Sequence, residues 1–192
     1  MVKRLFFFLN IVIIYLFSIG ISSANLQKKI IDKLVTTKTL SFNFKQKISN
    51  KEEIGICFIK YPLLMKCNYQ NLKQKTIISN GKTVAIIKKK YKKIYLYPVK
   101  STPLFFILKK EKIINLVRNT KPIEINSNLI GFIFTGKKTN KVKILFDKSS
   151  LEPKGWETKD AYSNKVSFEI NNLIINNQIV DDFFKIPQEK DL

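Results

Sequence analysis

The chain has 192 residues and a formal net charge of +21, and it contains no histidine. The lack of histidine excludes imidazole metal sites and removes the usual general base of serine and cysteine hydrolases. Nucleic-acid recognition is disfavoured because nearly all cations are lysine, whereas arginine, whose rigid fork reads bases and phosphates, occurs only at Arg4 and Arg118.

The N-terminus has the three-part pattern of a secretory signal peptide. A cationic start, MVKR, precedes the long apolar stretch LFFFLNIVIIYLFSIGI and small residues that end at Ala24. We therefore expect residues 1–24 to be cleaved as a signal peptide and residues 25–192 to form a single exported domain. An uncleaved membrane anchor is the alternative, because the apolar stretch approaches the ~20 residues that span a bilayer.

An amphipathic helix is predicted at the start of the mature chain, where Leu26, Ile30 and Leu34 recur at steps of four. From Leu40 the period changes to two, and LSFNFKQKI is typical of a half-buried strand. Five further strand-length segments follow at residues 53–61, 63–71, 73–81, 82–90 and 92–100. Six successive strands without a crossover helix predict an antiparallel meander.

Cys57 and Cys67 flank a turn predicted at residues 61–64. In a hairpin about this turn the two cysteines fall nearly opposite each other, within the Cβ separation of cross-strand pairs. Export permits a disulfide between them. Two reduced thiols facing the apolar interior are the alternative.

Lysines crowd the stretch AIIKKKYKKIYLYP, residues 85–98, around Tyr91. A charged hairpin tip explains this pattern, because lysine is well solvated there and discourages edge pairing. The codon bias of an AT-rich genome would also enrich lysine along the whole chain. A docking patch for acidic proteins or anionic lipid head groups is the functional alternative.

The segment STPLFFILKKEKIINLVRN, residues 101–119, interrupts the strands with apolar residues at helical spacing. Ser101 or Thr102 could cap its start and Pro103 suits the first helical position, so we predict one helix or two short ones. Strands are predicted again at residues 129–137, 141–149, 154–162, 165–173 and 182–187. The fold class is thus mainly antiparallel β within the α+β class, with about 11 strands.

Several local strings carry a family resemblance. They are Phe-x-Gln at 44–46, Lys-x-Pro around residue 62, Ser-Asn-Gly-Lys at 79–82 and the Thr-Pro-Leu helix start at residue 102. In this order and after a signal peptide, they resemble the periplasmic outer-membrane lipoprotein carrier family, LolA, over essentially the whole mature chain. The resemblance implies an incomplete half-barrel, covered by an N-terminal helix and a mid-chain lid helix, with a hydrophobic cavity between.

The resemblance also implies a function in the periplasm of a Gram-negative bacterium. There the protein would act as a monomeric chaperone that accepts acylated lipoproteins from an inner-membrane ATP-driven exporter and passes them to an outer-membrane lipoprotein acceptor. No catalytic residue, metal, cofactor or nucleic-acid partner is expected. The alternatives are a lipid- or lipoprotein-sensing module with the same fold but no transfer role, and a basic surface-binding protein whose core is full.

Candidate residues for contact with acyl chains come from the strands and from the lid. Each of them could equally be ordinary core packing. They are Phe42, Phe44, Phe58, Met65, Tyr69, Leu104, Phe105 and Leu108.

Two positions depart from the family pattern. The family usually carries an arginine just before the proline, where it helps to hold the lid shut, but this chain has Tyr61 there. We expect Tyr61 to act as the latch by bonding a lid carbonyl through its hydroxyl. The family also usually carries an aromatic residue near the position that Cys67 occupies in this chain.

Overall fold

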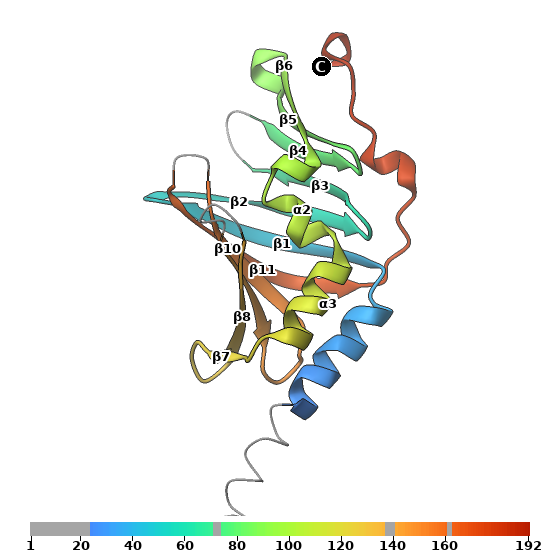
Figure 1. The fold of residues 1–192 in the computed structure, drawn as a ribbon. Helices are drawn as coiled ribbons and strands as arrows, with labels where there is room; N and C mark the ends of the chain where they lie inside the picture. The colour runs from blue at the N-terminus through green and yellow to red at the C-terminus, as the bar shows by residue number, and fades with distance from the viewer. Residues whose placement is uncertain (1–23, 71–73, 137–140, 161–162) are drawn as a thin grey trace, which may run out of the picture.

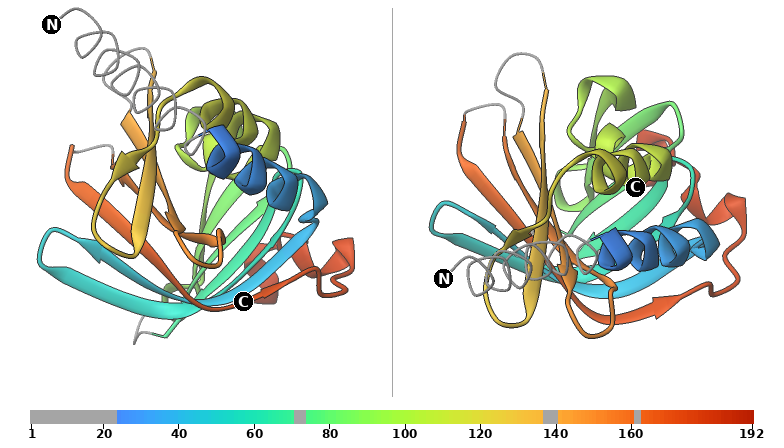
Figure 2. Two further views of the ribbon diagram at one scale, coloured as in Figure 1. Left: turned by 90° about the horizontal axis from the view of Figure 1, so that it is seen from below. Right: turned by 60° about the horizontal axis from the view of Figure 1, so that its bottom comes forward.

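The computed structural model describes residues 24–70, 74–136, 141–160 and 163–192. The predicted signal peptide lies outside these residues, apart from Ala24. One antiparallel sheet of 11 strands, in the order β6-β5-β4-β3-β2-β1-β11-β10-β9-β8-β7, dominates the fold. The sheet curls into an open half-barrel and the helices lie across its open side (Figures 1 and 2). The predicted incomplete antiparallel barrel is therefore confirmed.

The sheet has two arms that meet where β1 pairs with β11. The first arm consists of β1 (Thr39–Ile48), β2 (Lys51–Lys60), β3 (Leu64–Tyr69), β4 (Lys75–Asn80), β5 (Thr83–Lys88) and β6 (Lys93–Pro98). The second consists of β7 (Ile123–Glu124), β8 (Leu129–Thr135), β9 (Lys141–Asp147), β10 (Pro153–Lys159) and β11 (Lys165–Ile175). The first arm is the predicted meander.

Strand β1 shows how sequence alternation sets the inner face of the sheet. Phe42 and Phe44 are 2% exposed on the concave face, whereas Lys45 points to solvent. Phe44 pairs with Gly55 across the ladder. A Cβ atom at Gly55 would lie 2.2 Å from the carbonyl oxygen of Asn68 and 2.7 Å from Cζ of Phe44. Only glycine lets the strands and the Phe44 ring approach this closely.

A bulge bends β10 toward the interior. The register between β9 and β10 shifts between Pro153 and Gly155. Gly155 has φ +149°, and a Cβ atom there would lie 2.1 Å from the carbonyl oxygen of Phe168. The bend carries the following residue, Trp156, onto the concave face, where it is 6% exposed.

Three helices cover the concave face (Figure 2). The N-terminal helix is described over residues 24–36, and it buries Ile30 and Leu34 as its predicted stripe requires. The predicted lid is two short helices, α2 (Leu104–Leu108) and α3 (Lys110–Asn119). They are separate because Lys109 between them has an extended backbone.

The predicted helix cap at Ser101 or Thr102 is wrong. The residue that precedes α2 is Pro103, and no side chain caps the helix. The hydroxyl of Thr102 instead donates to the carbonyl of Val99, 2.9 Å away, because the chain arrives through a short 3₁₀ turn at Val99–Ser101.

The predicted strand at residues 182–187 is also wrong, because this segment starts with a 3₁₀ turn, Asp181–Phe184. Phe183 and Phe184 both pack against the convex side, which the alternation of a strand would not permit. The tail that follows covers a small second core, formed by Ile78, Ala85, Ile87, Ile94, Ile186 and Leu192. The eleventh strand is β7, whose two residues are too few to show a period.

The structure shows how two features of the first arm are built. Cys57 and Cys67 face each other across β2 and β3, with 4.0 Å between their Cα atoms, and form a disulfide. The lysine-rich connection is a 3₁₀ turn, Lys89–Tyr91, between β5 and β6, and none of its residues is buried. The predicted solvated hairpin tip is therefore present, and a docking role of its lysines stays a prediction.

Candidate functional site

An apolar hollow of about 310 Å³ opens between α2 and the concave face of the sheet. This volume lies at the lower end of the ~300–1,000 Å³ range of ligand pockets. The walls of this hollow come from β1, β3, β4, β5, β6, β10 and β11. The lining residues are Gln46, Ile48, Met65, Cys67, Tyr69, Ile77, Val84, Ile86, Tyr97, Thr102, Pro103, Leu104, Ile107, Trp156, Thr158, Lys159, Asp160, Val166 and Phe168.

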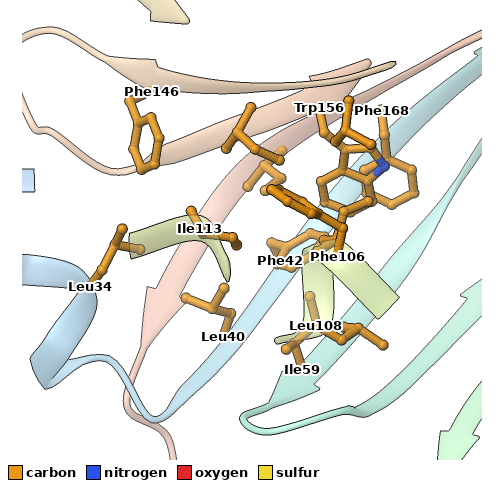
Figure 3. Close-up of a cluster of buried hydrophobic side chains, with 14 of the residues drawn as sticks. Leu34, Leu40, Phe42, Ile59, Phe106, Leu108, Ile113, Phe146, Trp156 and Phe168 are labelled. Atoms are coloured by element: carbon orange, nitrogen blue, oxygen red, sulfur yellow. The ribbon is translucent and has the colours of Figure 1, made fainter. Parts of the chain in front are cut away.

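The other end of the interior is filled by side chains. The space bounded by Leu34, Ile113 and Phe146 has a volume of only about 20 Å³. Figure 3 shows the side chains of Leu108 and Ile113 reaching from the helices toward the sheet. We call this region, under the N-terminal helix and α3, the filled end, and the region of the 310 Å³ cavity under α2 the hollow end.

A row of aromatic rings backs the hollow end. Trp156 stacks on Phe168 with ring centroids 4.0 Å apart, and Phe168 stacks on Phe44 at 4.7 Å. The Phe44 ring meets Tyr69 edge-on at 4.8 Å. The Tyr69 hydroxyl donates to Oε1 of Gln46 over 2.7 Å, and burial, with a smaller effect from the charge of Glu53, raises the pKa of this phenol. The rings of this wall are thus packed against one another, and the tyrosine is neutral at physiological pH.

Three predicted contact residues, Met65, Tyr69 and Leu104, line the hollow directly. Phe42 and Phe44 lie behind this lining, in contact with Phe168. The remaining lid candidates lie elsewhere: Leu108 is fully buried in the core and Phe105 lines a neighbouring depression.

Phe58 does not belong to this site. Its neighbours Cys57 and Ile59 are 0% exposed on the concave face, so Phe58 points to the convex face, where its ring centroid lies 5.0 Å from that of Phe183. The apolar run ICFI hid this alternation in the sequence. The register between β1 and β2 assigns the direction of Phe58 and could have been inferred from a hairpin alignment.

Sequence reasoning missed two residues that separate the ends of the interior. Ile107 and Trp156 line both the hollow and the nearly filled space. Ile107 falls on the predicted helical stripe, but its contact with the sheet depends on how α2 docks. Trp156 reaches the concave face only through the bulge at Gly155, which no local pattern signals.

We call the two lid helices, α2 and α3, the cover. A few polar contacts attach the cover to the rest of the fold. The Lys110 ammonium donates to the carbonyls of Val35 and Thr37 over 2.9 and 2.8 Å. These carbonyls lie at the C-terminal end of the N-terminal helix, where the helix dipole favours a cation. The backbone N–H of Leu63 donates to the carbonyl of Leu108 over 3.0 Å.

The opposite end of the cover is held by Gln27. Its side-chain amide donates to the carbonyls of Val117 and Thr120 over 2.6 and 2.9 Å. These acceptors belong to the last turn of α3 and to the residue after it, whose carbonyls have no partner within the helix. The N-terminal helix thus holds α3 at both of its ends.

Tyr61 does not form the predicted hydroxyl bond to a lid carbonyl within the described residues. Its ring turns into the interior and lines the nearly filled space, and burial raises the pKa of its phenol. The Lys110 ammonium lies 5.8 Å from the centre of the ring. The cation that holds the two lid helices is therefore Lys110 of α3, whereas the family usually carries an arginine at the strand position of Tyr61.

The described residues contain neither a cluster of metal ligands nor a membrane-spanning helix. Over residues 24–70, 74–136, 141–160 and 163–192, no three His, Cys, Asp or Glu side chains gather as metal ligands would. In the same part of the chain, no helix combines the length and the apolar character needed to cross a membrane.

The sequence matches the profile of the family "Outer membrane lipoprotein carrier protein LolA" over residues 35–187. No curated protein matches the chain significantly. The match covers the end of the N-terminal helix, all 11 strands and the cover.

Three solved structures align with this chain at very low sequence identity, and the first of them shares its fold. An uncharacterized conserved protein from Thermus thermophilus aligns with a TM-score of 0.52 and 7% identity, over 86% of this chain and 94% of the other. A LolA superfamily protein from Nitrosomonas europaea aligns with a TM-score of 0.44 and 7% identity, over 85% and 97%. A putative outer membrane lipoprotein-sorting protein domain from Vibrio parahaemolyticus aligns with a TM-score of 0.45 and 12% identity, over 85% and 94%.

Proposed function

This chain belongs to the LolA family of outer membrane lipoprotein carrier proteins, and we propose that it binds the acyl chains of lipoproteins in its hollow end. In this proposal residues 1–24 direct the chain to the periplasm and are removed. The mature protein then accepts lipoproteins released from an inner-membrane ATP-driven exporter. It carries them, as a monomer and without bond-breaking chemistry, to an acceptor at the outer membrane.

The apolar hollow of about 310 Å³ is the observation that carries the proposal. Exposing an acyl chain to water costs about 0.8 kcal/mol per CH₂, so a ~16-carbon chain resists crossing an aqueous compartment by roughly 12 kcal/mol. A carrier must therefore shield the chain. Side chains such as Ile77, Ile86 and Val166 offer the apolar contacts that do so.

Release requires that the ligand can be displaced, and the filled end supplies a competitor. Ile107 and Leu104 of α2 line the hollow, and Leu108 of the same helix is fully buried beside it. A long chain that extends from the hollow toward the filled end must displace these side chains. Ligand binding and packing of the cover are then alternatives for the same apolar surface, which keeps the site from holding its ligand irreversibly.

Binding of an acylated peptide by the delipidated mature protein tests the proposal. Calorimetry should detect binding of a palmitoylated peptide and none of the same peptide without the acyl chain. The substitution Ile77→Trp, which fills the hollow, should weaken binding at least about tenfold, since it removes the space for roughly two CH₂ groups. Ile56→Trp is the matched control, because Ile56 is 39% exposed on the convex face.

Transfer separates a carrier from a sensing module with the same fold. The protein should remove a lipoprotein from inner-membrane vesicles in the presence of the exporter and pass it to an acceptor. Retention of the lipoprotein would favour a sensor. Absence of any binding by delipidated protein would contradict both functions.

A further inference from the structure

A second depression lies directly beside the hollow. It has a volume of about 330 Å³ and lies between α2 and the ends of β8, β9 and β10. The two spaces share Thr102, Pro103, Thr158, Lys159 and Asp160 as lining residues. A ligand can therefore occupy both without crossing the core.

The depression differs from the hollow in its charge. Lys100, Lys112 and Lys159 line it, and none of the three forms an ion pair with another described residue. The Lys112 ammonium lies 5.4 Å from the ring centre of Phe105, which also lines the depression.

Asp160 is the one carboxylate among the lining residues. It already accepts hydrogen bonds from the backbone N–H and the side-chain amide of Asn164, over 2.9 and 3.0 Å. Three cations against one engaged carboxylate leave the depression positive. Its charge suits an anionic group.

We propose that the site selects amphiphiles with an anionic head, placing the alkyl chain in the hollow and the carboxylate or phosphate among Lys100, Lys112 and Lys159. This inference rests on the proposed function, because it requires that the hollow accepts an alkyl chain. It adds the chemical class of the ligand, which an apolar cavity alone does not define. The matching group is an anion that lies close to the point where the alkyl chain leaves the hollow.

The three lysines are partly open to solvent, so each contributes modestly. Exposed ion pairs are individually weak, and three lysines that line one depression should favour an anionic head about tenfold over a neutral head. The preference should shrink as salt is added, because exposed charges are screened within ~10 Å at 0.1 M ionic strength.

Twelve-carbon ligands that differ only in the head provide the test. Calorimetry on the delipidated mature protein should rank laurate about tenfold tighter than 1-dodecanol, with dodecyltrimethylammonium weakest. Dodecyl phosphate should bind at least as tightly as laurate. Inorganic phosphate alone should bind far more weakly than dodecyl phosphate, since it gains nothing from the hollow.

A charge-matched pair of variants locates the effect. The triple variant Lys100→Gln, Lys112→Gln, Lys159→Gln should bind laurate and dodecanol with similar affinity, at the affinity of dodecanol. The triple variant Lys89→Gln, Lys90→Gln, Lys92→Gln removes the same charge from the exposed hairpin tip and should keep the preference.

Equal binding of laurate and dodecanol by the unmodified protein would overturn this inference and leave the proposed function standing. Equal loss of preference in both triple variants would also overturn it, because it would show a response to net charge alone. Failure of every alkyl ligand to bind would overturn both proposals.

Discussion

The two ends of the interior differ in how completely side chains from the helices fill the concave face of the sheet. At the filled end, side chains from α3 and the N-terminal helix occupy the concave face and leave about 20 Å³. At the hollow end, the five-residue helix α2 leaves apolar side chains of β3, β4 and β5 uncovered, and about 310 Å³ is left open. Protein interiors are otherwise close-packed. The comparison indicates that one end provides stability and the other provides room for a ligand.

The sharpest test of this difference truncates one leucine at each end of α2. Leu108→Ala should lower the free energy of unfolding by about 2–5 kcal/mol, because Leu108 is fully buried and the gap cannot close. Leu104 faces the hollow, so Leu104→Ala should lower the free energy of unfolding by less than about 1 kcal/mol. Urea unfolding measures both, and equal losses would mean that the ends are packed alike.

The disulfide stabilises the hollow end, where packing is incomplete. Cys67 lines the hollow, and its bond to Cys57 ties β2 to β3 across 10 residues of chain. The double substitution Cys57→Ala, Cys67→Ala should lower the free energy of unfolding by about 2–4 kcal/mol. A reductant should destabilise the unmodified protein to a similar degree and leave the double variant unchanged. A loss below about 1 kcal/mol would show that the bond adds little here.

Loosening the lid helices should both destabilise the fold and speed the exchange of ligand. Lys110→Met removes the two hydrogen bonds to the carbonyls of Val35 and Thr37. We expect a loss of about 1 kcal/mol in stability together with faster exchange of bound acyl ligand. Lys109→Met is the matched control, since the Lys109 ammonium has no hydrogen bond or ion pair among the described residues. Slower exchange in the Lys110 variant would contradict a cover that competes with ligand.

The smallest expected effect concerns the turn that follows β9, next to the filled end. The Ser149 hydroxyl and the backbone N–H groups of Ser150 and Ser149 hydrogen-bond Asp147 and lower its pKa from 3.8 to about 2. The carboxylate therefore adds stability above pH 3.8, and this contribution is lost as the pH falls toward about 2.

Thermal unfolding of Asp147→Asn beside the unmodified protein measures that contribution. The unmodified protein should be slightly more stable above pH 3.8, and the two should converge as the pH approaches about 2. Asp147 lies in a surface turn where solvent screens its charge, so the difference in midpoint should be small. A difference that grows toward low pH would contradict this role of the turn.

Local periodicity predicted the parts of the fold that depend on single elements. The alternation from Leu40 and the spacing of Ile30 and Leu34 are both present as expected. The sequence did not predict which face of the sheet Phe58 occupies, because apolar residues occupy both faces of β2. The position of Trp156 depends on a bulge, which arises from contacts between strands rather than from a local pattern.

The candidate site was less predictable than the fold for the same reason. Met65, Tyr69 and Leu104 were found because the resemblance placed them on strands and lid. The role of Lys110 depends on how α3 packs against the N-terminal helix, 73 residues away from Thr37 in the chain. Such long-range contacts cannot be predicted from a short window of sequence.

Quenching of the single tryptophan tests the central claim most directly. Trp156 is the one tryptophan of the chain and lines the hollow. A palmitoylated peptide with bromine atoms in the acyl chain should quench Trp156 fluorescence along the same curve as its calorimetric binding, because bromine quenches only at contact. Binding without quenching would place the acyl chain elsewhere and contradict the account.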